Sequence, residues 1–507
     1  MIKSSKIAKN TIFLYIRMIL VLVTTLYTSR VVLQVVGVVD YGIYQTVGGV
    51  VAFLAMANTA LSVGTSRFLT YELGTGNQEK LNDLFCMTFW GHLLLAVVIC
   101  GLAETIGLWF VYNKLSIPPD RMDAAVFSYH VTVLTAFFLL SQAPYTALII
   151  AHEKMKIYAY VSIVEVFAKL GVVFSLMAAS VDKLKLYVFL LFIVQFSLVV
   201  FYRIYCLKNF REASLRLIWK ADILKPVFKF SGLNFVMEAA KALNNQGFIV
   251  LTNMFFGPAV VAARAIALQV NSAANQFVNN FRLASNPQII KLEASGNVDD
   301  SHKLVLQSAK YTYFLMLLLA LPIVLGSKQL LQLWLGQVPD YSVVFLQLAV
   351  IQSLVTTFDL SFHHALLAKG RLKEETVASF LMMLVGFVMV YILFRLEYSP
   401  ISLCFVAIAQ YAILGLIVKP ILMHKISGYS YSEIVKIFFS CIKVSIVAAI
   451  IPVVVTLYFP ESRGLFVVSS IISVFSVGLS VYFLGIDKEA RTKFNFLVVK
   501  KYNEFFR

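Results

Sequence analysis

Apolar runs long enough to cross a lipid bilayer follow one another from Asn10 to Gly485, with only short polar breaks between them. A membrane-spanning helix needs about 20 mainly apolar residues. The pattern therefore predicts about 14 transmembrane helices. They are expected at residues 10–36, 42–65, 84–111, 126–150, 158–180, 186–207, 228–253, 259–285, 306–326, 343–367, 376–394, 401–422, 437–459 and 465–485. No break could hold a folded domain, so we expect an all-α polytopic membrane protein.

Composition supports this prediction. Of the 507 residues, 60% are hydrophobic and only 14% are charged, and the mean hydropathy is +0.83, far from the averages of soluble domains. The basic N-terminus is followed by an apolar run that is too long for a signal peptide and has no small-residue cleavage site, so we expect it to remain as the first span. The cysteines fall in or beside apolar spans, which predicts neither disulfides nor a metal cluster. They are Cys86, Cys100, Cys206, Cys404 and Cys441.

The positive charges indicate the orientation. An even number of spans places both termini on one side, and the loops on that side hold most of the Lys and Arg, including Lys369, Lys419 and dense clusters at 203–229 and 488–507. The positive-inside rule then predicts cytoplasmic termini. Anionic headgroups next to these loops account for the net charge of +17, so no nucleic-acid partner is expected.

An internal repeat suggests the domain organisation. A shift from position 37 to 257 aligns Gly37 with Gly257, and the same shift aligns Gly76-Asn77 with Gly296-Asn297. This indicates two parallel six-helix repeats, an arrangement common in secondary transporters. The predicted parts are an N-terminal lobe at 1–207, a cytoplasmic basic linker at 208–227, a C-terminal lobe at 228–422, and two further helices with a cytoplasmic tail at 423–507. The linker either lies along the inner membrane surface or is a plain connector.

Charged residues inside the predicted spans are the main functional signal. Each costs at least ~2.5 kcal/mol near the bilayer centre, so such residues usually face a protein interior or an aqueous cavity. The cations are Arg17, Arg30, Lys169, Lys241, Arg264, Arg282 and Lys443, and the fewer acids are Glu104, Glu165, Glu238 and Asp359. Helical spacing predicts two local ion pairs, Glu165 with Lys169 and Glu238 with Lys241.

Polar residues also form a stripe along the predicted helix 259–285, where Arg264, Asn271, Asn275, Asn279 and Arg282 share one broad face. Such a stripe either joins helices through hydrogen bonds or lines a hydrated, cationic cavity. Arginine suits phosphate because its planar fork donates two parallel hydrogen bonds. The predicted substrate-binding residues are Arg17, Arg30, Lys241, Arg264, Asn271, Asn275 and Arg282. For Arg17, Arg282 and Lys443 the alternative is snorkelling to headgroups.

Asp359 and His363 are spaced i,i+4 in the predicted span 343–367. Histidine titrates near neutral pH, and Asp/His chains in membranes act as proton relays, so this pair is our candidate for ion coupling. The alternative is a local hydrogen-bonded pair.

Several short motifs resemble the bacterial polysaccharide transporter family. They are Leu26-Tyr-Thr-Ser-Arg30, Gly37-Val-Val-Asp-Tyr41-Gly42 and Gly64-Thr-Ser-Arg67 with Glu72. That family includes O-antigen flippases and belongs to the multidrug/oligosaccharidyl-lipid/polysaccharide exporter (MOP) superfamily. The resemblance implies two lobes forming a V around a cationic cavity, and a groove for a lipid tail beside two extra helices. It makes Arg17, Arg30 and Arg264 candidates to bind pyrophosphate, although span 42–65 has no arginine in its apolar core.

The expected function is therefore a flippase in the bacterial inner membrane. It would move an undecaprenyl-pyrophosphate-linked oligosaccharide, such as an O-antigen, capsule or exopolysaccharide repeat unit, by alternating access. No bond is broken, so neither an enzyme nor a cofactor is expected. The expected partners are the lipid-linked substrate and membrane lipids, and also a polysaccharide polymerase and a chain-length regulator.

Two other functions compete with the flippase. A drug/cation antiporter on the same fold would need acids in the cavity. A membrane glycosyltransferase or polymerase would need acidic residues at an outer-face site, where Asp40 is a lone candidate.

Overall fold

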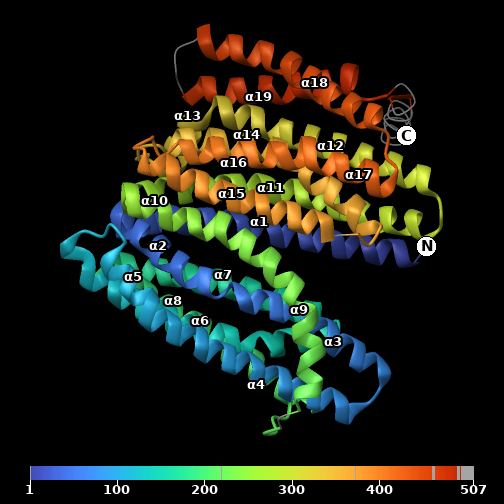
Figure 1. Cartoon of the computed structure of the whole chain (residues 1–507). Helices are drawn as coiled ribbons and strands as arrows, with labels where there is room; N and C mark the ends of the chain where they lie inside the picture. Colours follow the sequence, from blue (N-terminus) through green and yellow to red (C-terminus); the bar gives the residue numbers. More distant parts are fainter. Residues whose placement is uncertain (1, 219, 372, 459–462, 488–490, 493–507) are drawn as a thin grey trace. The chain divides into compact units, whose positions relative to one another are not determined.

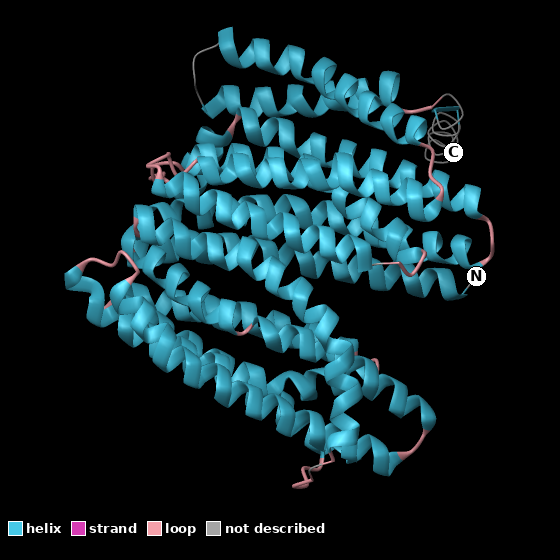
Figure 2. Cartoon of the chain, in the orientation of Figure 1, coloured by secondary structure: helices cyan, strands magenta, loops and turns pink. Residues whose placement is uncertain are grey.

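The computed structural model describes residues 2–218, 220–371, 373–458, 463–487 and 491–492, and every regular element in these ranges is helical (Figure 2). In this described part, 11 helices are long and apolar enough to cross a membrane, or up to 12 if the bent pair α2 (Val38–Leu54) and α3 (Met56–Thr75) forms one span. The predicted all-α membrane fold is confirmed.

The predicted number of about 14 spans is not confirmed. Two of the predicted spans, 228–253 and 259–285, are helical, but their described residues do not form a stretch that is apolar enough to count among these 11 helices. The first is α9 (Ala221–Ala242) with its continuation, and the second is α11 (Pro258–Ala294). These are two helices for which the sequence shows polar stripes, and the stripes lower their hydropathy.

The chain groups into two compact units. Unit 1 comprises Met1–Ala265 and Met383–Pro400, and unit 2 comprises Ile266–Met382 and Ile401–Arg507. The predicted lobe limits, 1–207 and 228–422, stay predictions.

Unit 1 is a bundle in which α6 packs on α8 and α4, α3 packs on α9, and α1 packs on α7 (Figure 1). Phe85, Tyr145 and Leu148 are fully buried in its core. The helices of this unit, besides α2, α3 and α9, are α1 (Ile2–Val36), α4 (Gln78–Leu102), η1 (Ala103–Gly107), α5 (Leu108–Asn113), η2 (Pro119–Arg121), α6 (Met122–Ala151), α7 (Met155–Ala178), α8 (Lys183–Asn209), η3 (Arg211–Ala213), η4 (Leu243–Gly247) and α10 (Phe248–Phe256), with the start of α11 and most of α15 (Lys373–Arg395).

Unit 2 begins within α11 and is built around α12 (Val298–Leu325), which packs on α14 (Ser342–Ala368), α18 (Tyr431–Tyr458) and α19 (Arg463–Ser480). Phe358, Phe362 and Met423 are buried in its core. Its other helices are α13 (Ser327–Leu335), the start of α15, α16 (Ser402–Ala412), η5 (Ile413–Val418), α17 (Lys419–Ser427) and η6 (Val481–Gly485).

Glycines at the repeat-related positions all have a positive φ. Gly37 and Gly257 precede α2 and α11 with φ of 93° and 79°, and Gly76 and Gly296 follow α3 and α11 with φ of 75° and 79°. A positive φ strains side chains that have a Cβ, so glycine is required at these turns. The sequence match at 37/257 and 76/296 therefore marks equivalent turns.

Candidate functional site

A buried charge cluster occupies unit 2. The ammonium of Lys419, at the start of α17, lies 2.8 Å from Asp359 Oδ1 of α14 and 2.8 Å from Glu375 Oε1 of α15, and it also donates to the Asp359 carbonyl at 2.8 Å. The side chains of Lys419 and Glu375 are each 4% exposed and that of Asp359 is 9% exposed. One lysine thus bridges two carboxylates away from water.

Local backbone geometry brings Lys419 to this position. The π-helical segment η5 directly precedes it, and a π turn changes the angular phase of the residues that follow it. Gly415 of η5 packs against the backbone of α14, where an added Cβ would lie 3.0 Å from the Asp359 nitrogen. The absence of a side chain at Gly415 allows this close approach.

Histidines and an arginine complete the cluster. His363 Nδ1 lies 2.8 Å from Glu375 Oε1, and Arg282 of α11 interacts electrostatically with Asp359. His364 Nε2 lies 3.0 Å from the amide nitrogen of Asn286. Two cations balance two carboxylates when the histidines are neutral, so one added proton makes the cluster cationic.

The structure therefore brings Arg282, Asp359 and His363 together, but Asp359 and His363 have different partners. Asp359 pairs with Lys419, and His363 pairs with Glu375. The local hydrogen bond between Asp359 and His363, given above as the alternative to ion coupling, is not formed, because Lys419 and Glu375 reach these groups from other helices. The charge pattern predicts Lys419 in a loop, although the predicted span 401–422 contains it and Leu416-Ile417-Val418 directly before it signals burial.

The middle of the α11 stripe is engaged within unit 2. Asn275 donates to Ser353 Oγ at 2.8 Å, and Ser353 donates to Asn271 Oδ1 at 2.9 Å. These contacts join α11 to α14 in the way expected of hydrogen-bonded polar stripes. Arg282 contacts Asn279 on the same helix.

Unit 1 holds the other cations that are predicted to bind substrate. Arg264 is 9% exposed, and its guanidinium carbon lies 5.9 Å from the centroid of the Phe248 ring. Arg30 is half-buried in α1 and forms no ion pair with any residue that the structure describes. Lys241 pairs with Glu238 at 2.7 Å, as its spacing predicts. Arg17 lies in α1, but its side chain is outside the described part.

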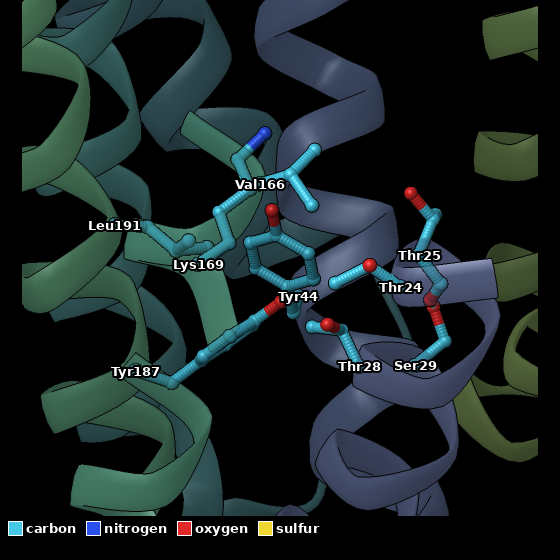
Figure 3. A pocket seen from close by; sticks show the side chains of 9 residues that line it. All are labelled: Thr24, Thr25, Thr28, Ser29, Tyr44, Val166, Lys169, Tyr187 and Leu191. Carbon is cyan, nitrogen blue, oxygen red and sulfur yellow. Dashed lines mark hydrogen bonds between the residues drawn. The ribbon is translucent and has the colours of Figure 1, made fainter. Parts of the chain in front are cut away.

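A hydroxyl-rich hollow of about 170 Å³ lies between α1, α2, α7 and α8 of unit 1 (Figure 3). Figure 3 shows hydroxyls of α1 facing the Tyr44 and Tyr187 rings, whose centroids are 5.1 Å apart. The ammonium of Lys169 is held 2.7 Å from Glu165, which confirms the predicted pair. The lining residues are Thr24, Thr25, Thr28, Ser29, Tyr44, Val166, Lys169, Tyr187 and Leu191.

All four acids that the sequence places inside spans are paired with a basic side chain. The nitrogen-to-oxygen distances are 2.8 Å for His130–Glu104, 2.7 Å for Lys169–Glu165, 2.7 Å for Lys241–Glu238 and 2.8 Å for Lys419–Asp359. These carboxylates are thus already engaged by basic side chains of the protein itself.

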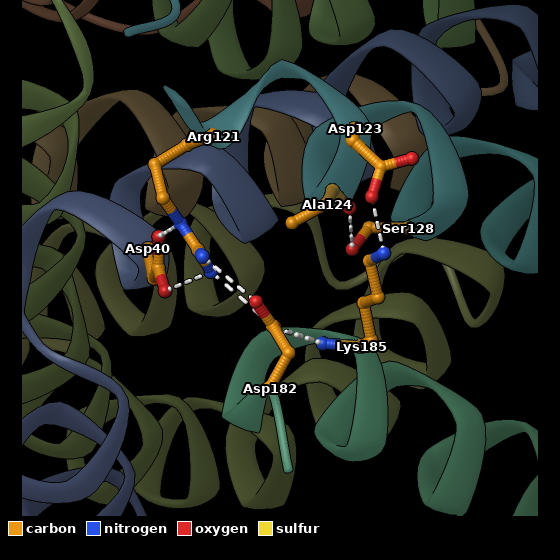
Figure 4. Close-up of polar contacts among 7 residues, drawn as sticks. All are labelled: Asp40, Arg121, Asp123, Ala124, Ser128, Asp182 and Lys185. Carbon is orange, nitrogen blue, oxygen red and sulfur yellow. Dashed lines mark hydrogen bonds and ion pairs between the residues drawn. The ribbon is translucent and has the colours of Figure 1, made fainter. Parts of the chain in front are cut away.

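A second ion-pair network joins the starts of three helices of unit 1 (Figure 4). Arg121 lies 2.5 Å from Asp40 of α2 and 2.7 Å from Asp182, which precedes α8. Lys185 contacts Asp123 beside it. Burial would raise the pKa of Asp182, but hydrogen bonds from Arg121 and from the Lys185 amide outweigh it and hold that pKa below its usual value. Asp40, the lone acid considered for an outer-face enzyme site, is occupied by Arg121.

Searches against protein-family models and curated proteins give no match. Solved structures do match. The lipid II flippase MurJ in an inward closed conformation superposes with a TM-score of 0.70 at 12% identity, covering 93% of this chain and 97% of that chain. An inward-facing multidrug-resistance MATE transporter of the MOP superfamily gives a TM-score of 0.67 at 14% identity, covering 80% and 96%.

A third match is a MOP-superfamily transporter from Pyrococcus furiosus, described as having a binding pocket of reversed polarity. It has a TM-score of 0.58 at 15% identity and covers 82% of this chain and 95% of that chain. The chain therefore has the fold of the MOP-superfamily transporters. At these identities the likeness shows the fold alone.

Proposed function

We propose that this protein is a flippase that moves an undecaprenyl-pyrophosphate-linked oligosaccharide across the bacterial inner membrane by alternating access. The observation that carries the proposal is the charge arrangement within the spans. Cations exceed acids there, and each of the four acids Glu104, Glu165, Glu238 and Asp359 is held by a basic side chain. A site of this kind favours an anionic substrate.

Phosphate binding is assigned to Arg264 and Arg30 of unit 1. Buried guanidinium groups keep their charge and donate two parallel hydrogen bonds to phosphate oxygens. Arg264 is 9% exposed beside Phe248, where a low local dielectric strengthens its attraction for an anion. Arg17 and Lys241 remain candidates for further contacts.

The hydroxyl-rich hollow of unit 1 supports a glycan substrate. Thr24 and Thr28 offer donors and acceptors of the type that sugar hydroxyls need, and Tyr44 offers an aromatic wall. A purely apolar drug would leave these hydroxyls without partners and lose affinity.

Ion coupling is assigned to the cluster of unit 2. Asp359 and His363 lie in α14, and they are faced by Arg282 of α11, Glu375 of α15 and Lys419 of α17. Tyr411 of α16 and His364 of α14 lie in the same electrostatic environment. A proton taken up by His363 or Asp359 would unbalance this neutral set and release Lys419 from one of its partners, which provides a two-state element for transport.

A drug/cation antiporter is the second candidate, because several matching structures are MATE transporters, one of them described as a multidrug transporter. Purified protein in proteoliposomes separates the two functions. A flippase should expose a lipid-linked pyrophosphate oligosaccharide to the outer leaflet and leave a cationic rhodamine dye untransported. Dye accumulation without glycan movement would contradict the proposal.

The orientation has its own test. A reporter active only outside the cytoplasm should give signal when fused at Val338 and stay silent at Gly296. The opposite pattern would reverse the predicted topology.

A further inference from the structure

The segment between α8 and α9 is bound along one face of α4. Asn82 donates to the carbonyls of Glu212 and Ser214 at 2.7 and 2.8 Å, and Trp90 Nε1 donates to the carbonyl of Arg216 at 2.9 Å. Between them, Cys86 Sγ lies 3.4 Å from the Ser214 carbonyl and accepts the Arg216 amide at 3.3 Å. Three side chains of α4 thus bind the backbone of every second residue of the segment, namely Glu212, Ser214 and Arg216.

The two spacings match. Asn82, Cys86 and Trp90 are each four residues apart, which is ~6.0 Å along a helix. Beyond the short turn η3, two residues of the extended chain advance ~6.6 Å, as from Ser214 to Arg216. The α4 face therefore satisfies the polar backbone groups of the extended chain that meet it. Such satisfaction is the condition under which non-helical backbone can enter the hydrocarbon region.

The contacts place the tip of the segment at the depth of the α4 span. Trp90 is eight residues beyond Asn82, or ~12 Å along α4, and the predicted apolar span begins at Leu84. Leu217 follows Arg216 at the tip and is 88% exposed, and Leu215 is 42% exposed. Lys220 then returns to the foot of α4, where its ammonium lies 2.5 Å from Asp83. Two outward-facing leucines at this depth are suited to lipid rather than water.

An apolar hollow of about 580 Å³ lies between the tip and α4. It is lined by Trp90, Leu93, Leu94, Val97, Leu217 and Ile218.

The segment 208–220 carries the exposed basic residues Lys208, Arg211 and Arg216. Its one acid, Glu212, is buried and held by Gln78 at 2.9 Å and by His152. The exposed charge of the segment is therefore cationic.

We propose that residues 211–218 form a membrane-inserted strap that binds an anionic phospholipid, with one acyl chain in this hollow and the phosphate against Arg216. The site is separate from the proposed flippase site and does not depend on it. Charge complementarity selects the headgroup, since each basic side chain near a membrane surface attracts anionic lipid.

Tryptophan fluorescence can test this site because Trp90 lines the hollow. The other tryptophans, Trp109, Trp219 and Trp334, are replaced by phenylalanine in the full chain, which is then placed in phosphatidylcholine vesicles with increasing brominated phosphatidylglycerol or brominated phosphatidylcholine. We expect phosphatidylglycerol to quench Trp90 at an about fivefold lower mole fraction, the preference that one basic contact provides.

Arg216→Gln should bring the two lipids close to equal quenching. Trp90 and Cys86 of α4 contact only the backbone carbonyl and amide of Arg216, so this change leaves the strap in place. Lys154→Gln, which removes an exposed positive charge elsewhere in unit 1, is the matched control and should keep the preference. Leu217→Asp should reduce quenching by both lipids while the thermal midpoint is unchanged.

Three results would overturn the proposal. Equal quenching by the two lipids before any change at Arg216 would remove the anionic site, and no quenching by either would place the strap outside the bilayer. Relief of quenching by equimolar polyprenyl phosphate would assign the hollow to the tail of the transport substrate instead.

Discussion

In each unit one cation bridges two carboxylates, but the two clusters differ in burial and in the type of cation. In unit 1, Arg121 joins Asp40 and Asp182, and its side chain is 25% exposed. In unit 2, Lys419 joins Asp359 and Glu375 and is 4% exposed. The guanidinium of Arg121 directs separate donors at each partner, whereas the ammonium of Lys419 is a compact charge that both carboxylates share.

This difference in burial predicts a structural role for the Arg121 network and a role in ion coupling for the Lys419 cluster. Water screens the Arg121 network, so losing one contact there has a modest effect. The Lys419 cluster lies in a low dielectric, where each charge depends strongly on the others. It also includes the imidazole of His363, whose Nδ1 lies 2.8 Å from Glu375 Oε1. We therefore expect changes at Lys419 and Asp359 to have larger effects than changes at Arg121.

Lys419→Met should have the largest effect. It leaves two buried carboxylates without their shared partner, and removing one partner of a buried pair costs about 3–5 kcal/mol. The thermal midpoint of the detergent-solubilised protein should fall steeply. Lys169→Met removes a more exposed lysine from its pair with Glu165 and is the control, with a much smaller shift expected. Equal midpoints for the two variants would contradict the claim that burial makes the Lys419 cluster more important for stability than the Lys169–Glu165 pair.

Asp359→Asn should have the second-largest effect, and it should reduce transport rather than the stability of the fold. Lys419 keeps Glu375 as a partner, so the protein should remain folded while its response to protons is lost. A coupling free energy of about 1–3 kcal/mol corresponds to a roughly 5- to 150-fold loss of gradient-driven accumulation. Vesicles with an imposed pH gradient measure this loss, and exchange without a gradient should persist. Unchanged accumulation would leave the cluster with a structural role only.

Arg121→Gln should have the smallest effect, about 1 kcal/mol of stability, because the pairs it breaks are partly exposed. It should also change the acid response. The pKa of Asp182 is lowered in the folded state, so its stabilisation is present above about pH 4 and is lost as the pH falls through the lowered value. Thermal midpoints between pH 6 and pH 3 should show this decline in the unmodified protein and little of it in the variant. Parallel curves would contradict the assignment.

The sequence predicted the helices well because a bilayer demands long apolar segments with internally satisfied backbone. It did not predict the 50° bend where α2 meets α3, since Ala55 at the break is neither proline nor glycine. The hydrophobic pattern also predicted spans at α9 and α11. Their polar residues make them less apolar than the helices that qualify as membrane spans in the described part of the chain.

The candidate site was predicted where its contacts are local. Glu165 with Lys169 follows from helical spacing, whereas Lys419 reaches Asp359 across 60 residues through the π turn η5. Periodicity along one helix carries no information about such a partner. Whether the arginines bind substrate stays a prediction, because it depends on a ligand.

The central claim, an anionic lipid-linked substrate, is tested most directly at Arg264. Flipping of a lipid-linked pyrophosphate oligosaccharide by the purified protein in proteoliposomes should rank Arg above Lys, Lys above Ala, and Ala above Glu at this position. Losing a charge-assisted bidentate contact costs about 1.5–3 kcal/mol, so Arg264→Ala should be roughly 10- to 150-fold slower. Lysine keeps the charge but not the fork, and glutamate repels phosphate. If Arg264→Glu, reconstituted at equal amounts, flips the glycan at the unmodified rate, the anionic-substrate account is contradicted.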